Sequence, residues 1–179
     1  MPVPDFSPGE VLTAAAMDQV GLWKIAETSF TTTATPFIDG CFSNDFENYV
    51  VVFRGLSSLT GAYTNVQLRR ATVVKSTDYS RAGLVSTTGG ALAADSGGTG
   101  QNGWRVAGQS SSGIYATMNF YRPFTSAETG YTVQTSYLGN FYSLGGIQTE
   151  SYSADGFQLI ASGNAATYTG TLRVYGYRN

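Results

Sequence analysis

The sequence predicts an all-β protein, in which a jelly-roll-like antiparallel β-sandwich head follows a short N-terminal arm with one helix. Two observations support the β head. Several short segments alternate apolar and polar residues, which is the period of a β-strand. The 179 residues also include 22 Gly, 12 Tyr and 10 Phe, a composition that favours strands joined by tight turns. A closed, barrel-like sheet is the competing architecture.

The N-terminal arm carries the only convincing helix signal. Ser7 and Glu10 have the spacing of a capping box. Pro8 occupies the first helical position, where a backbone N–H would have no partner within the helix, so its missing N–H costs nothing. Gly21 follows as a C-terminal cap would. One face of the expected helix carries Leu12, Ala16 and Val20.

We therefore expect an attachment arm at residues 1–21 and a β-sandwich head at residues 22–179. An apolar arm without a partner would fray or aggregate, so a docking surface on another protein is expected. The residues expected to anchor this arm are Val3, Phe6, Val11, Leu12, Val20 and Trp23.

The head begins with several predicted strands. Residues 22–42 are expected to form one or two strands broken near Pro36. Residues 49–54 are apolar on both parities, which indicates a strand buried on both faces. Residues 66–69 alternate cleanly, and the later change of parity suggests a bulge near residues 69–70.

The second half of the head has the clearest half-buried strand, at residues 114–120. Its inward parity carries Ile114, Ala116, Met118 and Phe120, and its outward parity includes Tyr115. Further strands are expected at residues 131–137, 157–161 and 171–177. Between these two halves, Ser86 to Gly103 is rich in glycine and is predicted to be a long surface loop, with a contact role slightly favoured over a flexible excursion.

Charge excludes one class of partner. The formal net charge is -2 and only 12% of residues are charged, with no basic stripe of the kind that binds nucleic acid. No segment is long and apolar enough to span a bilayer, and no signal peptide is expected at the start. Neither a nucleic acid nor a membrane is therefore an expected partner.

The residues that usually carry enzyme chemistry are sparse. The chain has no histidine and a single cysteine, Cys41, which removes histidine-based triads and most zinc sites. Carboxylates are scattered, so a paired-carboxylate glycosidase stays open but nothing points to one. An oxygen-ligand calcium site is equally unsupported. We expect a protein that is not an enzyme and has no cofactor or metal, with Cys41 in the core.

Aromatic residues are the best candidates for a contact surface. Trp104, Tyr115 and Tyr121 could form an oligomer interface or a sugar-stacking surface, whereas packing across strands is the simpler explanation for any one of them. Tyr115 and Tyr121 lie on the expected outward face of their strand, where we expect contact with another subunit rather than exposure to solvent.

Two segments carry a family resemblance. Residues 6–18, FSPGEVLTAAAMD, resemble the opening of many tailed-bacteriophage virion proteins, with Asp18 where Asn is often found. Residues 46–51, FENYVV, and the ending at residues 168–178, YTGTLRVYGYR, resemble small fibre-like and decoration proteins of marine and cyanobacterial phages. The middle of the chain carries no such resemblance.

The resemblance implies a non-enzymatic virion protein assembled in the host cytoplasm, most simply a homotrimer whose arm docks on a tail or capsid protein. The leading hypothesis is a fibre-type protein whose head projects toward the host surface, where a glycan is a conceivable partner. A capsid decoration protein is the first alternative. A carbohydrate-binding or carbohydrate-cleaving head is the second.

Overall fold

The computed structural model describes residues 21–163 and 165–177. These residues form β-strands and contain no helix, which confirms the all-β prediction. The expected N-terminal helix lies outside the described residues, together with the five arm candidates Val3, Phe6, Val11, Leu12 and Val20. In the part of the chain that can be described, no helix is long and apolar enough to cross a membrane.

The strands follow one another along the chain with short connections. Their bounds are β1 Trp23–Thr33, β2 Phe37–Ile38, β3 Asn48–Ser57, β4 Tyr63–Arg70, β5 Val73–Val74, β6 Tyr79–Ser86, β7 Leu92–Gln101, β8 Trp104–Gly108, β9 Ile114–Tyr121, β10 Thr129–Tyr137, β11 Asn140–Gln148, β12 Gly156–Ser162 and β13 Tyr168–Tyr177.

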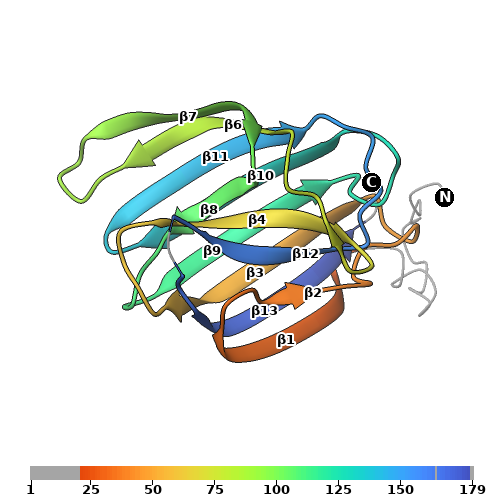
Figure 1. The fold of residues 1–179 in the computed structure, drawn as a ribbon, viewed down its shortest axis with the longest axis horizontal. Coiled ribbons are helices and arrows are strands. Elements are labelled where there is room, and N and C mark those ends of the chain that lie inside the picture. Colours follow the sequence, from red (N-terminus) through yellow and green to blue (C-terminus); the bar gives the residue numbers. More distant parts are fainter. Residues whose placement is uncertain (1–20, 164, 178–179) are drawn as a thin grey trace, which may run out of the picture.

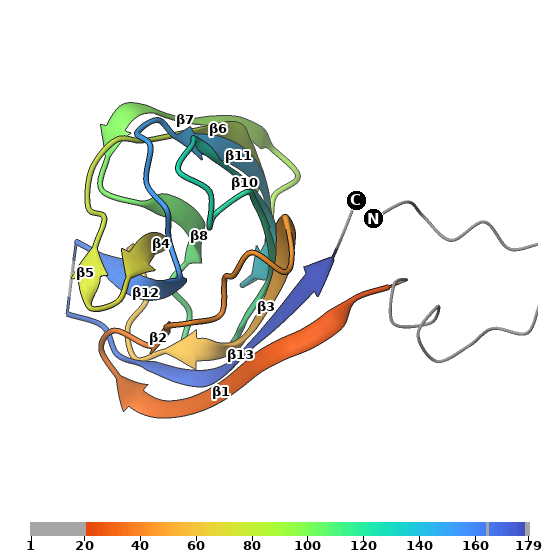
Figure 2. The same ribbon diagram turned by 90° about the vertical axis from the view of Figure 1, so that its right-hand side faces the viewer.

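The strands form two antiparallel sheets. The larger sheet has the order β1-β13-β3-β9-β10-β11-β6-β7, and the smaller one has the order β2-β12-β4-β5, with β8 also paired to β4. The larger sheet curves around the smaller one (Figures 1 and 2), and the smaller sheet covers its inner face. The sandwich-like prediction is consistent with this arrangement.

An aromatic cluster fills the space between the sheets. The Trp104 ring stacks on Tyr131 with centroids 4.7 Å apart and an interplanar angle of 3°, and Phe120 lies 5.6 Å from Phe157 of the opposite sheet. All four side chains are almost completely buried. Fully burying a large apolar side chain contributes roughly 1.5–3 kcal/mol, so this cluster holds the two layers together.

Two of the predicted strands can be compared with the structure residue by residue. In β9, Ile114 to Phe120 alternate between buried and exposed positions as expected, and Tyr115 and Tyr121 face outward. The strand predicted at residues 49–54 is present as part of β3, but it is not buried on both faces, because the outward Val50 and Val52 are half-buried and Arg54 is exposed. The break near Pro36 is also present, because β1 ends at Thr33 and β2 starts at Phe37.

The bulge predicted near residues 69–70 is absent, because β4 runs without a register shift through its pairing with β12. The change of parity instead marks a turn. Ala71 has a φ of 53°, and the chain returns at once to pair β5 with the end of β4. A turn and a bulge both invert the parity of a sequence pattern, so the sequence did not separate them.

The prediction of a long surface loop from Ser86 to Gly103 is wrong. Residues 92–101 form β7, which pairs with β6 along its length with two register shifts. Small residues and glycines can occupy this edge strand because its backbone hydrogen bonds to β6 do not depend on side-chain size. Asp95 points inward from β7, and an inward charge is a known protection against edge-to-edge aggregation.

Candidate functional surface

The three aromatic candidates of the head differ in their exposure to solvent. Tyr115 and Tyr121 lie on the outer face of β9 and are 52% and 36% exposed. Trp104 is fully buried, so its prediction as a surface residue is corrected. It faces inward from β8, and its indole nitrogen donates a hydrogen bond of 3.1 Å to the carbonyl of Ser80. A Trp that packs a core in this way is indistinguishable in sequence from an exposed one.

The last candidate of the arm, Trp23, lies in the described part of the chain. It opens β1 at the edge of the larger sheet, and its ring lies 6.0 Å from that of Phe46. Trp23 is half-buried by this contact. It therefore belongs to the head, next to the point where the arm joins it.

The outer face of the larger sheet is uncharged over five neighbouring strands. The strands β9, β10 and β11 contain no Asp, Glu, Lys or Arg. The charged residues of β6 and β7 are Arg81 and Asp95, and they pair with each other on the inner side. A broad face without charge has little electrostatic cost to bury, which is typical of the centre of a protein interface.

A hollow of about 490 Å³ opens in the middle of this uncharged face. The small residues Ala82 and Gly145 leave the space, and hydroxyl and amide side chains surround it. The Asn119 amide donates to the Thr132 hydroxyl at 3.1 Å. The polar side chains lining the hollow are Thr117, Asn119, Thr132, Gln134 and Ser143. They offer hydrogen bonds to a protein or a sugar, but no general base or strong nucleophile.

A second hollow, of about 370 Å³, lies where β13, β3 and β9 meet the loop before β9. It is lined by Arg54 and Arg173, by the ring of Tyr115, and by the hydroxyl residues Ser112 and Thr171. Sequence reasoning found Tyr115 but missed both arginines. Arg54 and Tyr115 are opposite each other in the register of β3 and β9, which only the strand pairing reveals.

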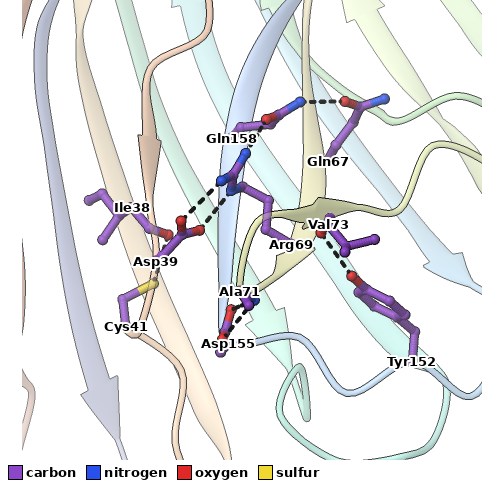
Figure 3. A network of polar contacts seen from close by, with 10 residues as sticks. All are labelled: Ile38, Asp39, Cys41, Gln67, Arg69, Ala71, Val73, Tyr152, Asp155 and Gln158. Atoms are coloured by element: carbon purple, nitrogen blue, oxygen red, sulfur yellow. Dashed lines mark hydrogen bonds and ion pairs between the residues drawn. The ribbon is translucent and has the colours of Figure 1, made fainter.

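A polar network crosses the outer face of the smaller sheet (Figure 3). Arg69 of β4 donates to both carboxylate oxygens of Asp39, at 2.7 and 3.0 Å, and to the Gln158 side chain of β12 at 2.7 Å. Gln158 in turn donates to Gln67 at 2.8 Å. The guanidinium also lies 4.4 Å from the ring centroid of Phe37.

This network joins strands rather than offering a site. The Asp39 carboxylate raises the pKa of Arg69, so the charge stays in place. Arg69 uses both sides of its fork within the protein, and it connects β4 and β12 to the end of β2. Asp155 closes the turn beside it by accepting from the Ala71 N–H.

A second buried ion cluster fastens the β6–β7 hairpin. Asp95 pairs with Arg105 of β8 and lies 3.4 Å from Arg81 of β6, and the three side chains are only 7%, 14% and 9% exposed. Arg105 stacks on Tyr63, with 3.4 Å between its central carbon and the ring centroid. Burial, and then the charge of Arg105, lower the pKa of Arg81. The cluster ties the smaller sheet to the edge of the larger one.

The described residues hold no group of three or more His, Cys, Asp or Glu side chains suited to a metal ion. Cys41 is buried in the core as predicted, and burial raises the pKa of its thiol, which disfavours the reactive thiolate. The chemistry available on the head is therefore hydrogen bonding, ring contact and two arginines in one hollow.

Comparison of the chain with models of known protein families, with curated proteins and with solved structures found no match.

Proposed function

We propose that this chain is a non-enzymatic structural protein of a virus particle, of the fibre type. Residues 1–21 would anchor it, and the β-sandwich head would carry its contacts. The observation behind the contact role is the uncharged outer face of β6, β7, β9, β10 and β11, whose burial costs little electrostatic energy. The virion setting is supported by the resemblance at residues 6–18.

The place where β1 begins suits such an arrangement. Trp23 at the start of β1 pairs with Gly176 near the end of β13, and both strands reach out beyond the smaller sheet (Figure 2). Trp23, the last of the anchoring candidates, thus lies at the β1 edge, opposite the β7 edge in the order of the larger sheet. The homotrimer and the jelly-roll-like connectivity remain predictions.

Imaging the virus particle by cryo-electron microscopy tests the location. Density on the tail supports a fibre, and density at capsid lattice positions supports the alternative, a decoration protein. Absence of the chain from purified particles would overturn both. A variant lacking residues 1–21 should keep a folded head that no longer joins the particle, whereas loss of the fold would make the arm part of the core.

Sedimentation of the full chain tests whether copies pack through the uncharged face. Gln134 lies exposed on β10 in the central hollow, so Gln134→Arg should dissociate the oligomer. Ser151→Arg adds the same charge at an exposed position beyond β11 and should leave the oligomer unchanged. A wild-type chain that stays monomeric at high concentration would instead assign the face to a different partner protein.

A carbohydrate-binding head is the second candidate, because hydroxyl and amide groups surround the central hollow. Binding on a glycan array that disappears in Asn119→Ala would support this function. A silent array with intact oligomers would count against it.

A further inference from the structure

The hollow between β3, β9 and β13 differs from the rest of the outer face because it carries positive charge. Arg54 and Arg173 line it, and none of its lining residues is acidic. A comparable hollow of about 240 Å³ near the start of β3 is lined by both Glu47 and Arg122, whose charged groups lie 3.9 Å apart. The two hollows therefore differ in net charge as well as position.

The charge of Arg54 is not neutralised by the protein that the structure describes. Within that part of the chain, Arg54 forms no ion pair, and its guanidinium lies 5.8 Å from the ring centroid of Tyr115. Arg173 contacts Glu27 at 3.1 Å, but Glu27 also accepts from Lys24 at 2.9 Å. Two cations, Arg173 and Lys24, thus share the Glu27 carboxylate, which is not among the residues that line the hollow.

The remaining lining groups suit a particular kind of ligand. Tyr115, which is 52% exposed, contributes an aromatic ring, and Ser112 and Thr171 contribute hydroxyl groups. Guanidinium groups recognise carboxylates through paired hydrogen bonds, and hydroxyls can both donate and accept. The volume, about 370 Å³, lies within the range of roughly 300–1,000 Å³ typical of small-ligand sites.

We propose that this hollow binds an acidic sugar, such as a uronic acid, with its carboxylate on Arg54 and Arg173. The ring of Tyr115 would lie against the sugar ring, and Ser112 and Thr171 would hydrogen-bond to its hydroxyls. A bare anion could use the arginines and the hydroxyl groups, whereas a sugar also uses the exposed aromatic ring of Tyr115. This inference concerns the head alone and holds wherever the protein is assembled.

The test is a titration of the isotope-labelled full-length chain followed by NMR. The probes are methyl β-glucuronide and methyl β-glucoside, which differ by the carboxylate. We expect shifts at residues 54, 115 and 171 with the glucuronide, and binding at least tenfold weaker with the glucoside. Arg54→Gln should weaken glucuronide binding about tenfold or more, because it removes a charge-assisted hydrogen bond.

The matched control is Arg122→Gln, which removes an exposed arginine from the hollow that also contains Glu47 and should leave binding unchanged. Equal binding of the two methyl glycosides, no binding by the glucuronide, or an unaffected Arg54→Gln variant would each overturn the proposal. Sulfate or a diglutamate peptide binding as tightly as the glucuronide would contradict the sugar assignment. Sedimentation of the same samples reports separately on the proposed packing through the uncharged face.

Discussion

Replacing Arg69 by Met should destabilise the head without changing its fold. The substitution removes a buried guanidinium, of which only 10% of the side chain is exposed, and keeps an unbranched chain of similar length. It breaks the two bonds to Asp39 and the bond to Gln158. The link across β2, β4 and β12 is thereby lost.

The magnitude follows from the groups that remain. Gln158 is 8% exposed, and its orphaned carbonyl oxygen costs about 1–3 kcal/mol. Loss of the cation–π contact with Phe37 costs a further 0.5–1 kcal/mol or so. Asp39 is 29% exposed and can be rehydrated, so it adds less than the 3–5 kcal/mol or so typical of a stranded buried charge. With some apolar burial of Met in return, we expect a net loss of about 2–3 kcal/mol.

Urea unfolding followed by tryptophan fluorescence measures this loss. With a slope of about 2–3 kcal/mol/M, the midpoint should fall by about 1 M. Arg70→Met is the control, because Arg70 is the next residue of β4 and is exposed. Its midpoint should change little, since exposed substitutions usually lie within about 0.5 kcal/mol. Equal midpoints for the two variants would refute the argument that the network stabilises the smaller sheet.

Three further predictions concern other buried groups. Asp95→Asn should lower the free energy of unfolding by about 3 kcal/mol, because it leaves two largely buried arginines without their carboxylate; an unchanged urea midpoint would contradict this. Burial raises the pKa of Tyr79 and Tyr131 above their ordinary value of 10.0, so the folded state holds the protonated form. Their contribution to stability is complete below pH 10 and is lost as the pH rises above it, which unfolding midpoints measured between pH 8 and 11 should show. Cys41 should resist a thiol reagent such as DTNB in the native protein and react fully in urea, whereas rapid native labelling would show that its burial is wrong.

The local sequence pattern predicted those features of the fold that depend on a single strand, such as which of its side chains face inward. The alternation at 114–120 placed Ile114 inside and Tyr115 outside because side chains of a strand point to opposite faces in turn. The break at Pro36 and the buried position of Cys41 were predicted on the same local grounds. The expected N-terminal helix is likewise a local prediction, and it lies outside the described residues.

The sequence did not predict the contacts that depend on strand pairing. β7 looked like a loop because its residues are small, yet its backbone pairs with β6. Trp104 was a candidate for a contact surface, but the pairing of β8 with β4 places its side chain in the core. The register between β3 and β9 places Arg54 directly opposite Tyr115. The strand order of the larger sheet makes the uncharged strands neighbours, so that they form one face. The sequence by itself thus determined the all-β class and the faces of single strands, because these depend on side-chain period. The tertiary structure alone decided which faces meet and where the hollows lie, because pairing joins residues far apart in the chain.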